Sequence, residues 1–281
     1  MDPQKYTDSE KYQQEIAEQY KKRVSKFSND EVLRVLQSLG ITGVDSNSIQ
    51  EAVVGNVNAT YLTPKFVIKM NQNREHPDYL PNKIVSDKLS SKYPVVKVVV
   101  YDFFEKTDYE VLVMERAPGT LLLDDFLELS NASQIILFRQ ILEVVKQLFV
   151  IEFDGFGSIN KLDNESFATY TDLLKNKFKQ YTSTIREKEL CDEKDMEKIE
   201  KYFLKNINIF DNEKPVFIHT DLHMGNILHE GSKLTAIIDF DSAQRAPKMC
   251  ALVSLLVLPT FLWVSRFATV SPPTPTLPRM P

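Results

Sequence analysis

The sequence predicts an α+β protein of two lobes, and three observations lead to this prediction. Short runs rich in β-branched and aromatic residues dominate residues 48–116, whereas apolar residues recur at helical spacing through residues 117–250. The breaker cluster Ala117-Pro118-Gly119-Thr120 separates the two patterns. We therefore expect a small β-rich N-lobe at 48–116 and a larger helical C-lobe at 117–250. A helical extension at 1–47 precedes them, and an atypical tail at 251–281 follows.

The composition is that of an ordinary soluble globular protein. Of 281 residues, 43% are hydrophobic and 26% are charged, which is enough for two lobes with cores of their own. A net charge of -5 gives no general reason to expect nucleic acid or an anionic membrane as a partner. Cys191 and Cys250 lie far apart without metal-ligand spacing, and Met1–Lys5 lacks the apolar segment of a signal peptide. These features favour a reduced, cytoplasmic location, and none of them indicates the oligomeric state.

The N-lobe is predicted to contain several strands and one helix, behind two helices of the extension. The first helix of the extension, 10–23, is highly charged, and the second begins near Asp30-Glu31 and ends at Gly40. The predicted helix of the lobe itself covers residues 82–91. The predicted strands are 49–54, 57–61, 65–70, 95–101 and 110–115.

Two features of these strands are candidates for function. Gly55-Asn56 is a turn candidate, for which a plain hairpin is favoured over a phosphate-binding loop because a single glycine is a weak signal. Lys69 ends an apolar strand, where an ammonium group is costly unless it is paired, bound to a ligand or facing water. From the strand alone, a functional lysine and a lysine on the open face of an edge strand are equally favoured.

The C-lobe is predicted to be mostly helical. A long amphipathic helix has Asn131 or Ser133 as its expected cap, and helices near 164–181 and 190–206 are charged on one face, which places them at the surface. Asp154-Gly155-Phe156-Gly157 superficially matches a metal-binding Asp-Phe-Gly motif, but two glycines after a long helix favour a turn. Core packing fully explains the apolar stripe of the long helix, which consists of Ile135, Phe138, Ile141, Leu142, Val145, Leu148 and Phe149.

The most informative stretch is His219-Thr220-Asp221-Leu222-His223-Met224-Gly225-Asn226, followed by Ile237-Ile238-Asp239-Phe240-Asp241. An apolar run that ends in Asp-x-Asp is typical of a buried strand that carries carboxylates at its end. Phosphoryl transfer needs a lysine and Mg²⁺ to neutralise the phosphates, and a carboxylate to orient and deprotonate the accepting hydroxyl. Asp221, Asn226 and Asp239 supply one base and two oxygen ligands of this kind. Each residue alone is more simply explained as a turn residue.

At these residues the sequence resembles the aminoglycoside phosphotransferase and choline kinase family, a branch of the protein-kinase-like fold. The resemblance runs in order from Glu51 to Leu256. It rests on the combination of His219-x-Asp221-x-x-x-x-Asn226 with Ile238-Asp239-Phe240-Asp241, which is more specific than either motif by itself. The resemblance implies a two-lobed protein-kinase-like fold.

The resemblance also implies roles for individual residues. Asp221 would be the catalytic base, and Asn226 and Asp239 would bind Mg²⁺. His219 would orient the loop, and Asp241 would either assist the metal or cap the turn. The implied contacts with the nucleotide, ATP or GTP, are Lys69, Gly55, Asn56, Met114, Glu115 and Ala117.

The sequence departs from the family in three places, two of which concern the site directly. The family usually offers a helix glutamate to pair with the strand lysine, but the best-aligned residue is Asn82. We expect Glu75 or Asp87 to replace it, or Lys69 to be partly exposed, because an unpaired buried charge costs about 3–5 kcal/mol. Met224 stands where proline is common in the catalytic loop, a change that we expect to be tolerated.

The third departure is the end of the chain. From residue 251 onward there is no Asp, Glu or Lys, and an apolar run up to Val264 gives way to a proline-rich end at 271–281. The apolar run is too short and too interrupted by proline for a membrane span. The family normally continues with helices that hold the acceptor substrate. We therefore expect that the C-lobe is truncated, or its reading frame shifted, and that the acceptor wall is incomplete.

The sequence thus favours a small-molecule kinase that transfers the γ-phosphoryl group of ATP or GTP to a hydroxyl group of an aminoglycoside-like or amino-alcohol substrate. A nucleotide-binding protein that does not transfer is the main alternative, because of the expected truncation. A metallohydrolase is a weaker alternative, since His219, Asp221 and His223 alternate as zinc ligands on a strand do. Asn226 and Asp239, at phosphotransferase spacing, argue against it. No spacing identifies the acceptor.

Overall fold

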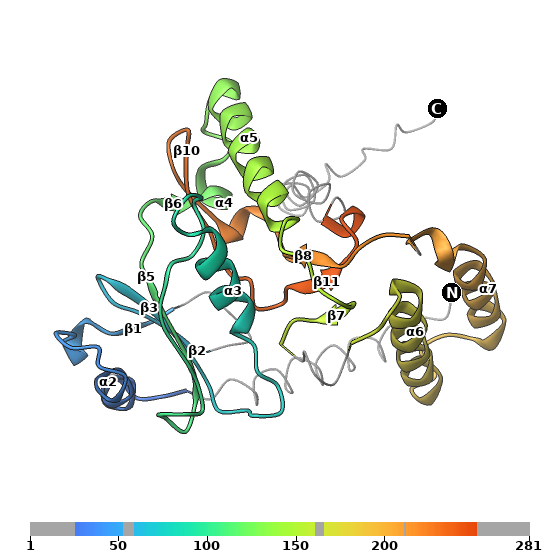
Figure 1. The fold of residues 1–281 in the computed structure, drawn as a ribbon, viewed down its shortest axis with the longest axis horizontal. Helices are drawn as coiled ribbons and strands as arrows, with labels where there is room; N and C mark the ends of the chain where they lie inside the picture. The colour runs from blue at the N-terminus through green and yellow to red at the C-terminus, as the bar shows by residue number, and fades with distance from the viewer. Residues whose placement is uncertain (1–25, 53–58, 161–165, 211, 252–281) are drawn as a thin grey trace, which may run out of the picture.

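The computed structural model shows two lobes, a small one built on a sheet and a larger one that contains most of the helices (Figure 1). The predicted α+β fold class is therefore confirmed. The residues that the structure describes are 26–52, 59–160, 166–210 and 212–251. The charged helix over 10–23, the turn at Gly55-Asn56 and the tail from residue 252 lie outside these ranges, so the expected truncation stays a prediction.

The described part of the N-lobe is built on a five-stranded antiparallel sheet in the order β1-β2-β3-β5-β4. The strands are β1 (Gln50–Glu51), β2 (Ala59–Leu62), β3 (Phe66–Asn71), β4 (Val98–Phe103) and β5 (Glu110–Glu115). Lys69 on β3 lies between Thr60 of β2 and Leu112 of β5. Lys69 is therefore on an inner strand, and the interpretation as an edge-strand lysine is wrong.

Each face of this sheet packs against a helix. The helices are α2 (Asn29–Ser38) and α3 (Leu80–Leu89), and a short 3₁₀ helix, η1 (Ser46–Ser48), follows α2. Side chains alternate between the two faces along a strand. On β5, Val111 and Val113 belong to the core against α2, whereas Leu112 and Met114 belong to the core shared with α3.

The C-lobe combines helices with two small antiparallel sheets, in the orders β10-β9-β6 and β7-β11-β8. The helices are α4 (Leu122–Asp125), α5 (Asn131–Leu148), α6 (Tyr170–Glu187), α7 (Glu193–Asn206), η2 (Ile207–Phe210) and η3 (Met224–Asn226). The strands are β6 (Thr120–Leu121), β7 (Gly157–Ser158), β8 (Val216–Ile218), β9 (Ile227–Glu230), β10 (Lys233–Ile237) and β11 (Gln244–Ala246). None of the described helices is long and apolar enough to cross a bilayer.

The long helix α5 differs from its prediction at the cap and along its apolar stripe. Ser130, and neither of the expected residues, caps the helix, because its Oγ accepts the backbone N–H of Ser133 at 3.1 Å. Asn131 is the first helical residue. Ile135 and Leu142 are 53% and 44% exposed, so core packing explains only part of the stripe.

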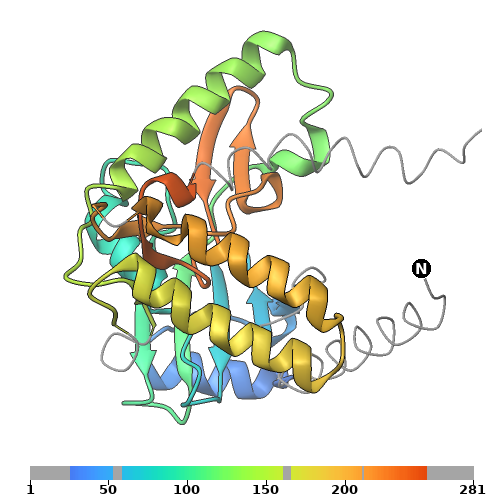
Figure 2. The ribbon, with the colours of Figure 1, turned by 90° about the vertical axis from the view of Figure 1, so that its right-hand side faces the viewer.

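The segment after α5 leads to the two surface helices. Asp154 and Gly155 form a bend, as the turn interpretation predicts, whereas Phe156 pairs with Phe167 through the backbone and Gly157 begins β7. Helices α6 and α7 lie side by side (Figure 2). The stacked rings of Phe178 and Phe203, with centroids 3.9 Å apart, join them.

The larger hydrophobic core is shared by both lobes. Met114 of the N-lobe belongs to the same buried cluster as Ile141 and Ile237 of the C-lobe. The backbone continues this contact, because the N–H of Val96 donates to the oxygen of Ile237 at 3.2 Å and the N–H of Ile237 donates to the oxygen of Pro94 at 2.9 Å. The end of β10 is thus held against the segment that enters β4, which fixes where the following residues emerge.

Candidate active site

A β-hairpin gathers two of the polar residues that the sequence singled out. In the β9–β10 hairpin, Ile227 lies opposite Ile237. One step further, the backbone N–H of Ile238 donates to the oxygen of Asn226 at 3.0 Å. Because of this register, Asn226 before β9 and Asp239 after β10 lie at the same end of the hairpin. Asp239 has a φ of 63°, a left-handed conformation that is uncommon for a non-glycine residue and often found at functional sites.

His219 anchors the loop between β8 and β9 to the end of β10. It follows β8 and is buried, with 3% of its surface exposed, and its Nε2 lies 2.9 Å from the backbone oxygen of Ile238. Burial lowers the pKa of His219 below its ordinary value, so the ring is neutral near pH 7. Its one ring proton is on Nε2, because a carbonyl oxygen only accepts. His219 therefore holds the loop against the end of β10, one residue before Asp239.

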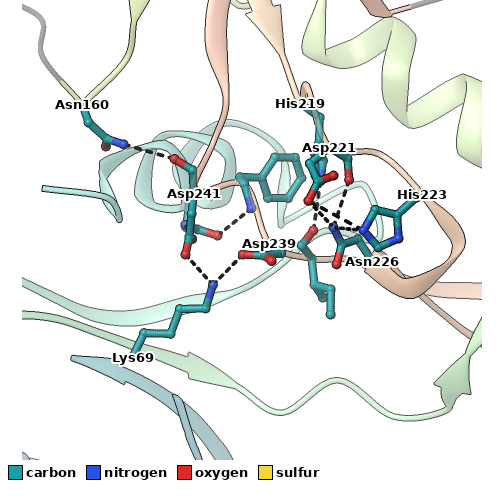
Figure 3. A network of polar contacts seen from close by, with 11 residues as sticks. Lys69, Asn160, His219, Asp221, His223, Asn226, Asp239 and Asp241 are labelled. Atoms are coloured by element: carbon teal, nitrogen blue, oxygen red, sulfur yellow. Dashed lines mark hydrogen bonds and ion pairs between the residues drawn. The ribbon is translucent and has the colours of Figure 1, made fainter. Parts of the chain in front are cut away.

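Asp221 lies where this loop turns sharply. At Thr220 φ is 25°, and the N–H of Asp221 donates to the carbonyl oxygen of His219. The side chain of Asp221 is 55% exposed. The Nδ2 of Asn226 donates to the backbone oxygen of Asp221 at 2.9 Å and to its Oδ2 at 3.3 Å (Figure 3). The two residues are thus locked together in the loop, with the carboxylate open to an incoming group.

Lys69 reaches the site from the N-lobe. Its neighbours Ile68 and Met70 belong to the core against α2, so strand alternation turns Lys69 toward the C-lobe. Its Nζ lies 2.7 Å from Oδ1 of Asp239 and 2.7 Å from Oδ2 of Asp241 (Figure 3). The site therefore joins a strand of one lobe to a strand end of the other.

Burial and neighbouring charges both shift the pKa values of Lys69, Asp239 and Asp241. Burial works to lower the pKa of Lys69, but the charges of Asp241 and Asp239 outweigh it and raise that pKa above its ordinary value. Burial raises the pKa of Asp241. It acts in the same direction on Asp239, but there the charge of Lys69 prevails and lowers the pKa. The lysine is thus firmly cationic, and the more exposed carboxylate is firmly anionic.

The partners of Lys69 differ from those expected. Glu75 is exposed, Asp87 pairs with a lysine of its own helix, and Lys69 is buried with 8% of its surface exposed. Both expected substitutes and the expected partial exposure are therefore wrong. The carboxylates come from the C-lobe, because the end of β10 lies beside β3. Asn82, the residue aligned with the family's glutamate, instead donates its Nδ2 to Oδ1 of Asp241 at 2.8 Å.

The other expected nucleotide contacts lie where β5 leaves the N-lobe. Met114 is buried in the shared core, and Ala117 is half-buried. Glu115 is exposed, and its Oε1 lies 2.5 Å from the Nζ of Lys97. Met114 and Glu115 end β5 and Ala117 follows in the connection between the lobes, whereas Gly55-Asn56 lies outside the described residues. Their contact with a nucleotide stays a prediction.

Asn226 and Asp239 fit the requirements of a Mg²⁺ site. The side chain of Asp239 is 42% exposed and already accepts one cation, the ammonium of Lys69. The Oδ1 of Asn226 accepts no hydrogen bond from the residues that the structure describes. Within the same ranges, no three His, Cys, Asp or Glu side chains are grouped to hold a metal. An amide and a carboxylate oxygen, completed by water and phosphate, suit Mg²⁺.

The structure adds two residues to the surroundings of the site. His223, considered from sequence only as a zinc ligand, accepts the N–H of Gly225 on Nδ1 at 3.0 Å, and its Nε2 lies 3.6 Å from Oδ2 of Asp221. Asn160, beyond β7, donates to the backbone oxygen of Asp241 at 3.1 Å (Figure 3). The closeness of His223 to Asp221 along the chain was a usable signal, but nothing in the sequence marks Asn160.

Comparison with known proteins places this chain in a family. Residues 50–270 match the model of the phosphotransferase enzyme family. The chain belongs to this family. The resemblance drawn from residues 219–241 is thereby confirmed, and a phosphotransferase acting on a small molecule is the description that it supports. The comparison with curated proteins gave no significant match.

Solved structures of aminoglycoside phosphotransferases share the fold of this phosphotransferase family member. The gentamicin complex of APH(2")-IIa has a TM-score of 0.63 at 16% identity, covering 83% of this chain and 76% of that one. ADP-bound APH(2'')-Ib has a TM-score of 0.59 at 17% identity, with coverages of 80% and 74%. The apo form of a thermostable APH(4)-Ia mutant gives 0.59 at 15% identity, with coverages of 83% and 80%. The predicted two-lobed kinase-like fold is confirmed.

Proposed function

We propose that this phosphotransferase moves the γ-phosphoryl group of ATP or GTP to a hydroxyl group of a small aminoglycoside-like or amino-alcohol substrate. The observation that carries the proposal is the meeting of four side chains at one place. Lys69 comes from the N-lobe sheet, and Asp221, Asn226 and Asp239 come from the C-lobe loop and hairpin. This is the set that phosphoryl transfer needs: a cation, a base and metal ligands.

Asp221 is the proposed base. Its side chain is half exposed, so an acceptor hydroxyl can reach it. Asn226 holds Oδ2 of the carboxylate, which leaves Oδ1 of Asp221 to accept the hydroxyl proton. The bond of His219 to Ile238 and the turn at Thr220 keep the loop in this arrangement. The base therefore stays oriented toward the acceptor while it remains in contact with solvent.

Lys69 and the metal ligands are proposed to act on the donor. The ammonium of Lys69 would contact the nucleotide phosphates, and Met114, Glu115 and Ala117 would line the base pocket. Asn226 and Asp239 would hold Mg²⁺ through Oδ1 of the amide and the carboxylate. When bound, Mg²⁺ would neutralise charge on the phosphates and position them.

The donor and acceptor classes rest on chemistry and on the neighbours. The structures with the same fold include complexes with ADP, ATP or AMP-PNP and with gentamicin, streptomycin or hygromycin B. Cationic acceptors of this kind suit a protein with 39 acidic and 34 basic residues. The identities of 14–17% leave the acceptor of this chain to experiment.

A turnover screen tests the proposal. Release of nucleoside diphosphate from ATP and GTP is measured with a panel of aminoglycosides and amino alcohols, with Asp221→Asn as the matched inactive variant. We expect acceptor-dependent turnover that requires Mg²⁺ and disappears in the variant. Nucleotide binding without turnover on any acceptor would instead support the transfer-deficient alternative. Stoichiometric zinc would support a metallohydrolase, an alternative that the described residues disfavour because no three of their His, Cys, Asp or Glu side chains are grouped to hold a metal.

A further inference from the structure

Asn82 occupies an unusual place for an amide side chain. It lies in the first turn of α3, is fully buried at 0% exposure, and uses both ends of its amide. The Nδ2 donates to Oδ1 of Asp241 at 2.8 Å, and the Oδ1 accepts the backbone N–H of Phe240 at 3.3 Å. Asn82 thus holds the end of β10 from the N-lobe helix through one side-chain and one backbone contact.

All three oxygen atoms of Asp241, those of its carboxylate and of its backbone carbonyl, contact other residues of the site. Its Oδ1 accepts from Asn82, its Oδ2 lies 2.7 Å from the Nζ of Lys69, and its backbone oxygen accepts from Asn160. Its side chain is 14% exposed, compared with 42% for Asp239. The two carboxylates beside Lys69 are therefore not equivalent, because Asp239 is open to solvent and Asp241 is enclosed.

This difference in exposure suits the two carboxylates to different roles. Under the proposed function Asp239 binds the metal, and a carboxylate that neutralises a metal is less available to neutralise Lys69. A buried ammonium left without a counter-charge would be strongly destabilised. Asp241 is placed to remain as its partner, with its second oxygen fixed by Asn82.

We infer that Asp241, held by Asn82, is the counter-charge that keeps Lys69 in position for the nucleotide phosphates, and that Asn82 is a positioning residue. The inference rests on the proposed function and adds to it a division of roles at the donor side of the site. In this chain the carboxylate that fixes the lysine comes from the C-lobe, and the N-lobe helix supplies an amide that orients it.

Variants of the pair test the inference. Asn82→Ala removes the donor to Asp241. Asn82→Asp keeps the shape and the acceptor for the N–H of Phe240, but sets a second carboxylate against Asp241, so it serves as the test if Asn82→Ala does not fold. In either variant we expect kcat/KM for the nucleotide to fall about tenfold, equivalent to ~1.4 kcal/mol, with the acceptor KM unchanged.

The exchange of the two side chains separates positioning from packing. Asp241→Asn alone removes the counter-charge and is expected to lower nucleotide kcat/KM. The double variant Asn82→Asp/Asp241→Asn restores one amide, one carboxylate and the net charge. We expect its nucleotide kcat/KM to exceed that of Asn82→Asp, a coupling that independent structural roles would not produce. A double variant whose losses simply add would overturn the inference.

Ser86→Ala is the matched control on the same helix. Ser86 is also buried, and its Oγ accepts the N–H of Val98 at 2.8 Å, away from the charged cluster. We expect this variant to lose thermal stability, as Asn82→Ala does, while its nucleotide kcat/KM stays within about twofold of the native value. If Asn82→Ala behaves in the same way as Ser86→Ala, Asn82 is only structural and the inference is wrong.

A binding measurement distinguishes failure of the inference from failure of the proposed function. The Kd for ATP is measured with the metal chelated. The measured affinity then reports the contact of the phosphates with Lys69, without a contribution from Mg²⁺ or from transfer. Weaker binding in Asn82→Asp than in Ser86→Ala supports the inference even if the native protein transfers to no acceptor. Equal binding in the two variants overturns it, while acceptor-dependent turnover by the native protein would still uphold the proposed function.

Discussion

Replacing Lys69 with methionine measures how much the charged cluster between the lobes contributes to stability. Methionine fills nearly the volume of the lysine stem, so packing changes little. The change removes the ammonium that lies 2.7 Å from both Asp239 and Asp241. Two neighbouring carboxylates then remain without their cation.

The exposures of the three side chains set the expected magnitude. Lys69 and Asp241 are 10% and 14% exposed, whereas Asp239 is 42% exposed. Breaking a buried ion pair costs about 3–5 kcal/mol, and solvent screens the share that belongs to a half-exposed partner. We therefore expect Lys69→Met to lower the free energy of unfolding by about 3 kcal/mol, most of it through Asp241.

Urea unfolding followed by circular dichroism at pH 7 provides the assay, with two comparison variants. Lys83→Met removes an exposed i,i+4 partner of Asp87 and should cost less than about 0.5 kcal/mol. Lys69→Met/Asp241→Asn removes the enclosed charge as well and should recover at least about 1 kcal/mol relative to Lys69→Met. The reasoning is refuted if Lys69→Met costs no more than Lys83→Met, or if the double variant is less stable than the single one.

Three further predictions concern Asp221, the buried His219, and Gly119 in the connection between the lobes. Asp221→Asn should lower kcat by about 10²–10⁴ in the turnover assay and leave the nucleotide Kd unchanged, because the residue acts on the acceptor proton. The lowered pKa of His219 means that the unfolded chain binds more protons than the native one below pH ~6.5, so stability should fall with decreasing pH by up to about 1.4 kcal/mol per unit, and less steeply in His219→Gln. Gly119→Ala should cost about 1–3 kcal/mol in urea unfolding, because φ is +102° and a Cβ would collide with the carbonyl oxygen of His229.

Each of these predictions has a result that would contradict it. Full turnover in Asp221→Asn would remove that residue from the role of base. Parallel pH–stability curves for His219→Gln and the native protein would show that His219 is not held neutral by the fold. Gly231→Ala is the control for Gly119→Ala, since Gly231 has a φ of +59° with open space around it, and equal losses in both would exclude the collision as the cause.

The sequence was most informative where a short segment determines its own structure. Runs of β-branched and aromatic residues located the strands of the N-lobe, and the cluster at Ala117-Pro118-Gly119-Thr120 follows the end of β5 at Glu115. The spacing of Asp221, Asn226 and Asp239 predicted a single site. This prediction was possible because β9 and β10 are neighbours in sequence, and their hairpin brings the residues before β9 and after β10 to the same end.

The partner of Lys69 could not be predicted in this way. Asp239 and Asp241 lie 170 and 172 residues away along the chain, and no local pattern indicates that β10 ends beside β3. The residues nearby in sequence do not serve as partners, because Asp87 of α3 has a lysine of its own and Glu75, in the turn before that helix, faces solvent. A long-range charge contact depends on how the lobes dock, and that depends on the whole core.

The core shared by the lobes has a consequence for folding. Leu112 and Met114 of the N-lobe sheet are covered by the same cluster that contains Ile141 and Ile237, so neither lobe can lose its fold without exposing apolar surface of the other. The backbone bonds of Ile237 with Val96 and Pro94 reinforce this dependence. The two lobes are therefore expected to melt in one cooperative transition, and a fragment that carries the N-lobe alone is expected to aggregate.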